Sequence, residues 1–313
     1  MSSRSRLALH RFAVGLVAAT LALIFAGGLV TSTGSGLAVP DWPLSFGQFF
    51  PRMVGGVLFE HGHRMVAALV GFLTLVLALL AAWIEPRRAV RRLAYLALAA
   101  VVVQGLLGGL TVLWLLPPAV SIAHACLAQG FLCLVVAFAV LTGPGWIAPA
   151  AGLPRVPRAL ATLTALTAGL VYVQVVLGAI MRHLGAGLAI PDFPLAFGTL
   201  LPPLGSAAVA IHFAHRVGAV VVTGLVVWTA WRVRAVPALA RAAAVAVALV
   251  ALQVALGALT IWTTKAVLPT TAHVAGGAAL LAATLVCALR ARRRAAPRAV
   301  RTRGLLTPER AAA

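Results

Sequence analysis

The sequence predicts an all-α integral membrane protein in which eight transmembrane helices form two parallel, pseudo-symmetric four-helix bundles. Hydrophobic residues make up 62% of the 313 positions and charged residues only 10%, with a mean hydropathy of +1.06. This is far more apolar than a soluble domain of similar length. The apolar residues gather in eight runs of membrane-spanning length. In addition, the loop after the first run recurs almost unchanged in the second half of the chain.

Each run is long enough for a helix to cross the bilayer, which takes about 20 residues. The first run follows Arg4, Arg6 and Arg11 as a secretory signal would, but about 19 apolar residues exceed a usual signal core, so we interpret it as a retained helix. In chain order, the predicted spans are Phe12–Val30, His61–Trp83, Leu93–Leu113, Val120–Leu141, Leu160–Ile180, Ala208–Trp231, Ala242–Ile261 and Pro269–Leu289.

The distribution of arginine predicts the orientation of the chain. Lys and Arg outnumber Asp and Glu by 25 to 5, but all except five of these cations lie at the two termini and in alternate connections. The positive-inside rule places those segments in the cytoplasm. We therefore expect a multi-pass protein of the cell membrane, embedded in the lipid bilayer, with both termini cytoplasmic and no nucleic-acid partner. The five other cations are Arg52, Arg64, Arg182, Arg216 and Lys265.

The chain contains an internal duplication. Ser35–Gly47 reads SGLAVPDWPLSFG and Ala186–Gly198 reads AGLAIPDFPLAFG, with nine of thirteen positions identical. A Q-x3-G-x2-T motif that begins at Gln104 recurs at Gln253. Because each half has an even number of helices, both halves enter the membrane from the same side, as parallel repeats do.

The duplication predicts two domains. Residues 1–150 hold the first four helices, and residues 151–313 hold the other four and a basic cytoplasmic tail. The Pro, Gly and Arg content of residues 144–157 suits a cytoplasmic linker between them.

Four histidines repeat between the halves: His63, His124, His215 and His273. All four fall within about two turns of the outer end of their helix, at one depth. A single histidine near a membrane interface is most simply snorkelling or bonded to a carbonyl. Four of them, paired within each half, favour two imidazoles facing one iron at about 2 Å each, as haem ligands inside each bundle. A zinc or copper site would require thiolate, carboxylate or a third histidine in each half.

The two halves differ just before these histidines. The first half reads EHGHR where the second reads HFAHR, so Glu60 stands where the second half has His212. Glu60 lies one helical turn before His63 on the same face, and a carboxyl group at an apolar boundary suits proton transfer. The alternatives are an ion pair with Arg64 or Arg52, or solvent exposure at the helix start. The mismatch predicts two sites with different roles.

Arg64 and Arg216 directly follow the histidines of these motifs. Guanidinium groups pair well with the propionate carboxylates of haem, although snorkelling would account for both residues as well. The repeated Pro-Asp-aromatic-Pro turns of the outer loops either cap a pocket or form part of an interfacial aromatic belt.

Taken together, these motifs resemble the haem A synthase family over essentially all eight helices. The residues that carry the resemblance are TGSGLAVPDWPL at 33–44, EHGHR at 60–64, His124, HFAHR at 212–216 and His273. The resemblance implies oxidation of the C8 methyl of haem O to the formyl of haem A, for cytochrome oxidase assembly. The methyl would be hydroxylated twice, and the resulting geminal diol would lose water.

The resemblance also implies a role for each matching residue. His63 and His124 would flank the substrate haem O, with Glu60 as the essential acidic residue beside it. His215 and His273 would bind the iron of a haem b that relays electrons to the first half. Implied partners are haem O synthase, cytochrome oxidase assembly factors and an electron donor such as a quinol or a redox protein, and a homo-oligomer is compatible with the sequence.

This chain departs from some bacterial members of that family, which carry a cysteine pair in the first outer loop. Val39 and Ser45 stand at those positions here, so no loop disulfide or thiol step is expected. Two other function classes fit parts of the pattern. One is a di-haem b-type quinol-oxidising electron carrier that does not modify haem, against which the Glu60 mismatch counts. The other is a transporter built from parallel repeats.

Overall fold

The computed structural model describes residues 3–147 and 155–295, and within them the predicted all-α fold is confirmed. Eight described helices are long and apolar enough to cross a membrane, one for each predicted span. Most extend past the apolar runs, because polar residues at the membrane boundary continue the helical backbone. They are α1 (Ser3–Ser32), α2 (Gly56–Ile84), α3 (Arg88–Leu113), α4 (Pro118–Thr142), α6 (Arg158–His183), α7 (Ala207–Val233), α8 (Pro237–Trp262) and α9 (Val267–Arg294).

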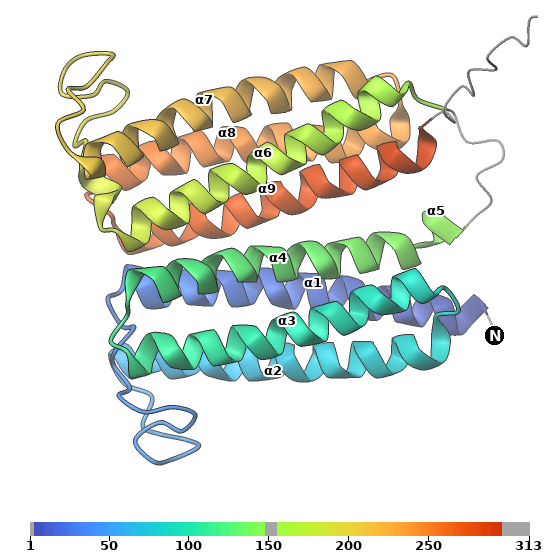
Figure 1. Cartoon of the computed structure of the whole chain (residues 1–313), viewed down its shortest axis with the longest axis horizontal. Helices are drawn as coiled ribbons and strands as arrows, with labels where there is room; N and C mark the ends of the chain where they lie inside the picture. Colours follow the sequence, from blue (N-terminus) through green and yellow to red (C-terminus); the bar gives the residue numbers. More distant parts are fainter. Residues whose placement is uncertain (1–2, 148–154, 296–313) are drawn as a thin grey trace, which may run out of the picture.

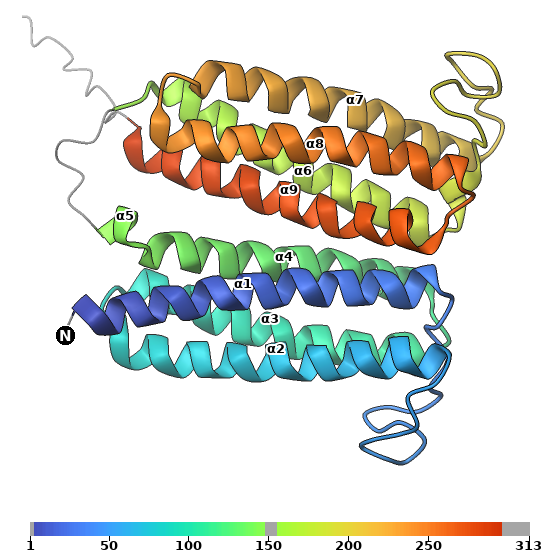
Figure 2. The same ribbon diagram turned by 180° about the vertical axis from the view of Figure 1, so that it is seen from behind.

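The long helices form two groups of four. Figures 1 and 2 show α1–α4 and α6–α9 lying side by side along their length, with α1 and α4 facing α6 and α9. Within each group, helices that follow one another in the chain pack together, and the last also packs on the first. The arrangement is consistent with parallel pseudo-symmetric repeats.

The apolar core fills the end of the bundles that lies away from the long loops. In the first half it includes Leu16 of α1, Leu77 of α2 and Phe138 of α4, all nearly inaccessible. Between the halves, a separate cluster joins Leu132 of α4 to Ala278 of α9. The four histidines lie at the opposite end of the bundles, near the long loops. The apolar core therefore packs the helices together at one end, and the histidines lie at the other.

Two long loops project from the same end of the molecule, one between α1 and α2 and the other between α6 and α7 (Figure 1). The second begins with the short helix η1 (Ala186–Leu188). The start of α1 and the end of α9 lie at the opposite end. There Val156 donates a backbone hydrogen bond to the Arg294 carbonyl, at 3.0 Å.

The predicted linker is described in part. Residues Pro144–Ile147 form the short helix α5, while the predicted domain boundary at residue 150 and the basic tail from residue 296 onward lie outside the described residues.

Candidate functional site

The four repeated histidines occupy equivalent places in four different helices. His63 lies in α2, His124 in α4, His215 in α7 and His273 in α9, each within the first nine residues of its helix. With a rise of about 1.5 Å per residue, this puts them about 9–12 Å from the loop end of the helix. All four side chains are half-buried.

A glycine on the preceding helix makes room for each of these imidazoles. A Cβ atom added at Gly27 would lie 3.0 Å from Cε1 of His63, and one added at Gly178 would lie 3.0 Å from Cε1 of His215. Gly108 has the same relation to His124, at 3.2 Å, and Gly257 to His273, at 3.3 Å. Few real Cβ atoms approach another atom this closely, so a side chain at any of these glycines would force the imidazole to shift by a few tenths of an ångström.

The rings of the second pair are spaced for a shared metal ion. The centroids of His215 and His273 lie 6.4 Å apart with an interplanar angle of 77°. Two imidazoles that bind one metal at about 2 Å from opposite sides have centroids about 6 Å apart. In the first pair, His63 and His124 are close enough for a direct charge interaction.

One ring nitrogen makes no hydrogen bond of good geometry in three of the four: it is the buried Nδ1 of His63, His124 and His273. The backbone carbonyls within reach of these three rings are those of Leu23, Gln104 and Gln253 in turn. A buried polar atom of this kind requires an explanation. Because Nδ1 is enclosed by protein, Nε2 is the nitrogen available to a metal ion.

Glutamines hold two of the histidines in place. The Gln104 amide donates to the backbone carbonyl of His124 at 2.9 Å. The Gln174 amide donates to the His215 carbonyl at 2.8 Å and lies 3.1 Å from its Nδ1. The role of Gln174 is absent from the sequence prediction, although its spacing to Gly178 repeats the Q-x3-G motif. In α1 the corresponding residue is Leu23, so His63 has no such glutamine.

These observations test whether the residues fit an iron porphyrin. Two imidazoles would hold the iron of such a group, whose macrocycle brings four nitrogens of its own. In the described part of the chain, no group of three or more His, Cys, Asp or Glu residues could hold a metal ion. The chemistry of the two histidine pairs therefore fits the iron of a haem, and the ring spacing that supports this fit is that of His215 and His273.

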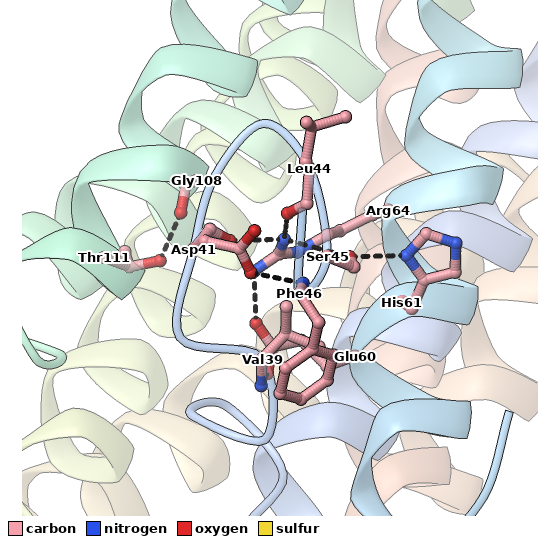
Figure 3. A network of polar contacts seen from close by, with 10 residues as sticks. All are labelled: Val39, Asp41, Leu44, Ser45, Phe46, Glu60, His61, Arg64, Gly108 and Thr111. Carbon is pink, nitrogen blue, oxygen red and sulfur yellow. Dashed lines mark hydrogen bonds and ion pairs between the residues drawn. The ribbon is translucent and has the colours of Figure 1, made fainter. Parts of the chain in front are cut away.

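Glu60 lies beneath the first loop and is only 3% exposed (Figure 3). Together with Arg64, it forms a set of contacts to the backbone of this loop that ties the loop to α2, which we call the latch. Its carboxylate accepts a hydrogen bond from the Val39 amide at 2.8 Å and one from Arg64 Nη2 at 2.6 Å. Arg64 also donates from Nη1 to the carbonyls of Asp41 and Leu44. Glu60 thus forms the ion pair with Arg64 that the sequence allowed. A catalytic role for Glu60 stays a prediction.

A second contact secures the same loop. The Ser45 hydroxyl lies 2.7 Å from Nδ1 of His61 (Figure 3), and both side chains are buried. Val39 and Ser45, which stand where a loop cysteine pair would be, therefore both help to hold the loop on α2.

The second half repeats the latch with a different acceptor. The Ile190 amide lies 3.2 Å from Nδ1 of His212, and Arg216 Nε lies 3.3 Å from its Nε2. A neutral imidazole can accept a hydrogen bond at only one nitrogen, whereas the Glu60 carboxylate accepts at both oxygens. Only one of the two N–H groups can therefore donate to His212 at a time, and both contacts are longer than those of Glu60.

Arg216 binds the backbone of its loop as Arg64 does. It donates to the carbonyls of Leu195 at 2.8 Å, Ile190 at 3.1 Å and Asp192 at 2.7 Å. The guanidinium groups of both arginines thus hold loops. Their binding to propionates stays a prediction.

The aromatic residues of the loops dock onto neighbouring helices. The Trp42 indole lies so close to Gly109 of α3 that an added Cβ would be 2.6 Å from it. Phe193 packs edge-on against Trp262 of α8, with centroids 6.0 Å apart. These rings anchor each loop over the end of its bundle.

Asp41 and Asp192 close the turns of the loops themselves. The Asp41 carboxylate accepts from the amides of Phe46 and Gly47, at 2.7 and 2.8 Å, and Asp192 accepts from the corresponding amides at 2.8 Å each. Both side chains lie outside the membrane-spanning helices. The structure gives the repeated aspartates a role in the turn and not at the histidines.

These turns are expected to persist until strongly acid pH. The hydrogen bond from the Gly47 amide lowers the pKa of Asp41 below its ordinary value of 3.8, and the bond from Gly198 does so for Asp192. A lowered pKa in the folded state means that the stabilising effect is present above 3.8 and is lost as the pH falls through the lower, folded value. Hydrogen-exchange protection of the Gly47 and Gly198 amides measures this. In Asp41→Asn, protection at Gly47 should be weaker and independent of pH, and unchanged pH dependence would contradict the assignment.

Comparison with known proteins gives one consistent result. The model of a family described as cytochrome oxidase assembly protein, COX15-CtaA, matches residues 52–285. The chain is 38% identical over 265 residues to a protein of Symbiobacterium thermophilum named "Heme A synthase", covering 80% of this chain and 85% of that protein. It is 30% identical over 268 residues to a protein of Shouchella clausii with the same name, covering 83% and 89%.

Proposed function

The chain belongs to the haem A synthase family of cytochrome oxidase assembly proteins, and from this membership we propose that it oxidises the C8 methyl of haem O to the formyl group of haem A. Membership implies an oxidoreductase of haem A biosynthesis. The observation that supports the reaction most directly is the set of four imidazoles, each seated against a glycine at one depth. A two-haem enzyme requires two such pairs.

In this proposal the two histidine pairs hold different haems. His63 and His124 would hold the substrate, haem O. His215 and His273 would hold haem b, whose chemistry is one-electron transfer. The 6.4 Å ring separation of the second pair supports a resident cofactor there, and the Gln174 contact to His215 holds that ring in orientation.

Glu60 is proposed as the proton-handling residue of the first half. With dioxygen as the oxidant, each hydroxylation would replace a methyl C–H bond by a C–O bond that takes one oxygen atom from O2. The other oxygen atom would leave as water, with two protons and two electrons from the donor, and the diol formed by the second hydroxylation would lose water. Among the described acidic residues, only Glu60 lies in a membrane-spanning helix, one turn from His63. The loop above it, latched by Arg64, limits access of water to this position.

The same proposal implies the partners of the protein and its location in the cell. Haem O comes from haem O synthase, electrons come from a quinol or a redox protein, and haem A passes to cytochrome oxidase assembly. The distribution of arginine supports a cell-membrane protein with cytoplasmic termini and with both haem sites toward the outer side. A homo-oligomer is compatible with this arrangement.

Expression in bacterial cells that make haem O but lack haem A should produce haem A in extracted pigment. Cells carrying an empty vector are the control. A folded, haem-loaded protein that yields no haem A would reject the proposal. Haem b alone with intact quinol oxidation would instead indicate an electron carrier, and protein without Soret absorbance would indicate a transporter.

A further inference from the structure

The duplication breaks at the outer end of α6. Arg182 and His183 stand there, while the corresponding positions at the end of α1 hold Thr31 and Ser32. A charged side chain within a membrane-spanning helix is costly and usually has a function. The first half has no charged residue at the corresponding position, so a comparison of the two halves does not indicate what Arg182 does.

Arg182 joins the two halves of the molecule. Its Nη2 donates to the Gly28 carbonyl at 3.2 Å and to the Ser32 hydroxyl at 2.9 Å, both in α1. Ser32 also accepts from the Thr271 hydroxyl of α9 at 3.0 Å. Three helices therefore meet at this guanidinium group.

The same junction lies beside the second histidine pair. Arg182 follows Gly178, which seats His215, by one helical turn on the same side of α6. Thr271 precedes His273 by two residues, and Arg182 is near enough to His273 for a direct charge interaction. The cation thus lies at the loop end of the site formed by these imidazoles.

No carboxylate of the described chain pairs with Arg182. At the same end of the molecule, Arg64 forms an ion pair with Glu60, and Arg216 donates hydrogen bonds to three loop carbonyls. Arg182 makes its two hydrogen bonds from a single nitrogen, and its Nε and Nη1 donate none to described residues. A guanidinium group has five N–H donors, so most of this cation's capacity is left for an anionic ligand.

We propose that Arg182 binds a propionate carboxylate of the tetrapyrrole held between His215 and His273. This rests on the proposed function, because it requires a haem in the second half. A planar guanidinium group suits a carboxylate, and the propionates are the anionic substituents of haem. The bonds to Gly28 and Ser32 hold Arg182 in place, so the propionate site is anchored on the other half.

The test removes the positive charge of Arg182 by substitution, or the negative charges of the propionates by esterification. Full-length protein is purified from haem-starved cells in a His63→Ala background, which disables a first-half ligand. It is then titrated with haemin or with haemin dimethyl ester, which lacks free carboxylates, and followed by Soret absorbance. With Arg182 present, the ester should bind about tenfold or more weakly than haemin. In Arg182→Gln that preference should shrink by about the same factor, and Arg182→Lys should be intermediate.

Ser32→Ala is the matched control, because it removes one contact to α1 and keeps the guanidinium group. It should retain the preference for haemin. If Arg182→Gln and Ser32→Ala both lower thermal stability and both keep the full preference, Arg182 only clamps the halves and the inference fails while the proposed function stands. If the parent protein binds neither haemin nor its ester, both fail.

Discussion

Gly178→Ala is expected to lower haem affinity at the second site by about 10- to 100-fold, the range seen when a residue that orients a metal ligand is lost. The new Cβ would lie 3.0 Å from Cε1 of His215. The ring cannot turn away freely, because Gln174 holds both its Nδ1 and its backbone carbonyl. The imidazole is therefore displaced from the position in which it opposes His273.

Loss of fold does not account for this result. Alanine is more favourable than glycine inside a helix by about 0.5–1 kcal/mol, which offsets part of the cost of displacing the ring, so the haem-free variant should still be folded and melt close to the parent. Gly169→Ala in the same helix is the control, since nothing lies within 4 Å of its Cβ position. Soret absorbance per protein and the melting temperature of haem-free protein measure the two effects. Equal haem binding by both variants would show that the glycine is not needed to seat the ring.

Glu60→Gln is expected to lower haem A formation by about 10²- to 10⁴-fold, as loss of a proton-transferring group does, while haem content stays near that of the parent. The amide keeps an oxygen to accept from the Val39 amide, so one latch contact survives. The negative charge opposite Arg64 is lost. Haem A formed per bound haem O is the measure of turnover.

Two further variants separate proton transfer from loop closure. Glu60→His gives the first half the acceptor that the second half already uses, and it should hold the loop but remain inactive. His212→Gln perturbs the second latch without touching the acidic position, and it should cost far less turnover than Glu60→Gln. Hydrogen exchange in residues 39–47 reports closure of the first loop. Full turnover by Glu60→Gln with an intact loop would confine Glu60 to the latch.

Most of the fold could be predicted from the sequence. Apolar runs of membrane-spanning length determine the helices, and the duplicated loops indicate the repeat. The four histidines stand out because the same residue at the same depth in both halves is improbable as packing. These inferences need only periodicity and spacing along one chain.

The contacts around the histidines could not be predicted in the same way. Periodicity shows that Gly178 and Gln174 share a face of a helix but not that His215 packs against that face. Arg64 has a long side chain that reaches loop carbonyls as easily as a ligand, so its position after His63 does not select between them. For Glu60, the sequence shows the mismatch with His212, whereas the equivalent latch contacts of both residues appear only in the folded chain.

The latches have a consequence for how the outer loops can change. Arg64 and Arg216 grip backbone carbonyls at matching places in the two loops, and Glu60 and His212 meet a backbone amide in each. Peptide groups are the same whichever side chain a residue carries. The backbone contacts are thus common to both loops, whereas the contacts of Trp42 with Gly109 and of Ser45 with His61 belong to the first half alone. If Ser35–Gly47 and Ala186–Gly198 were exchanged, each loop should keep its backbone contacts and lose those of its side chains.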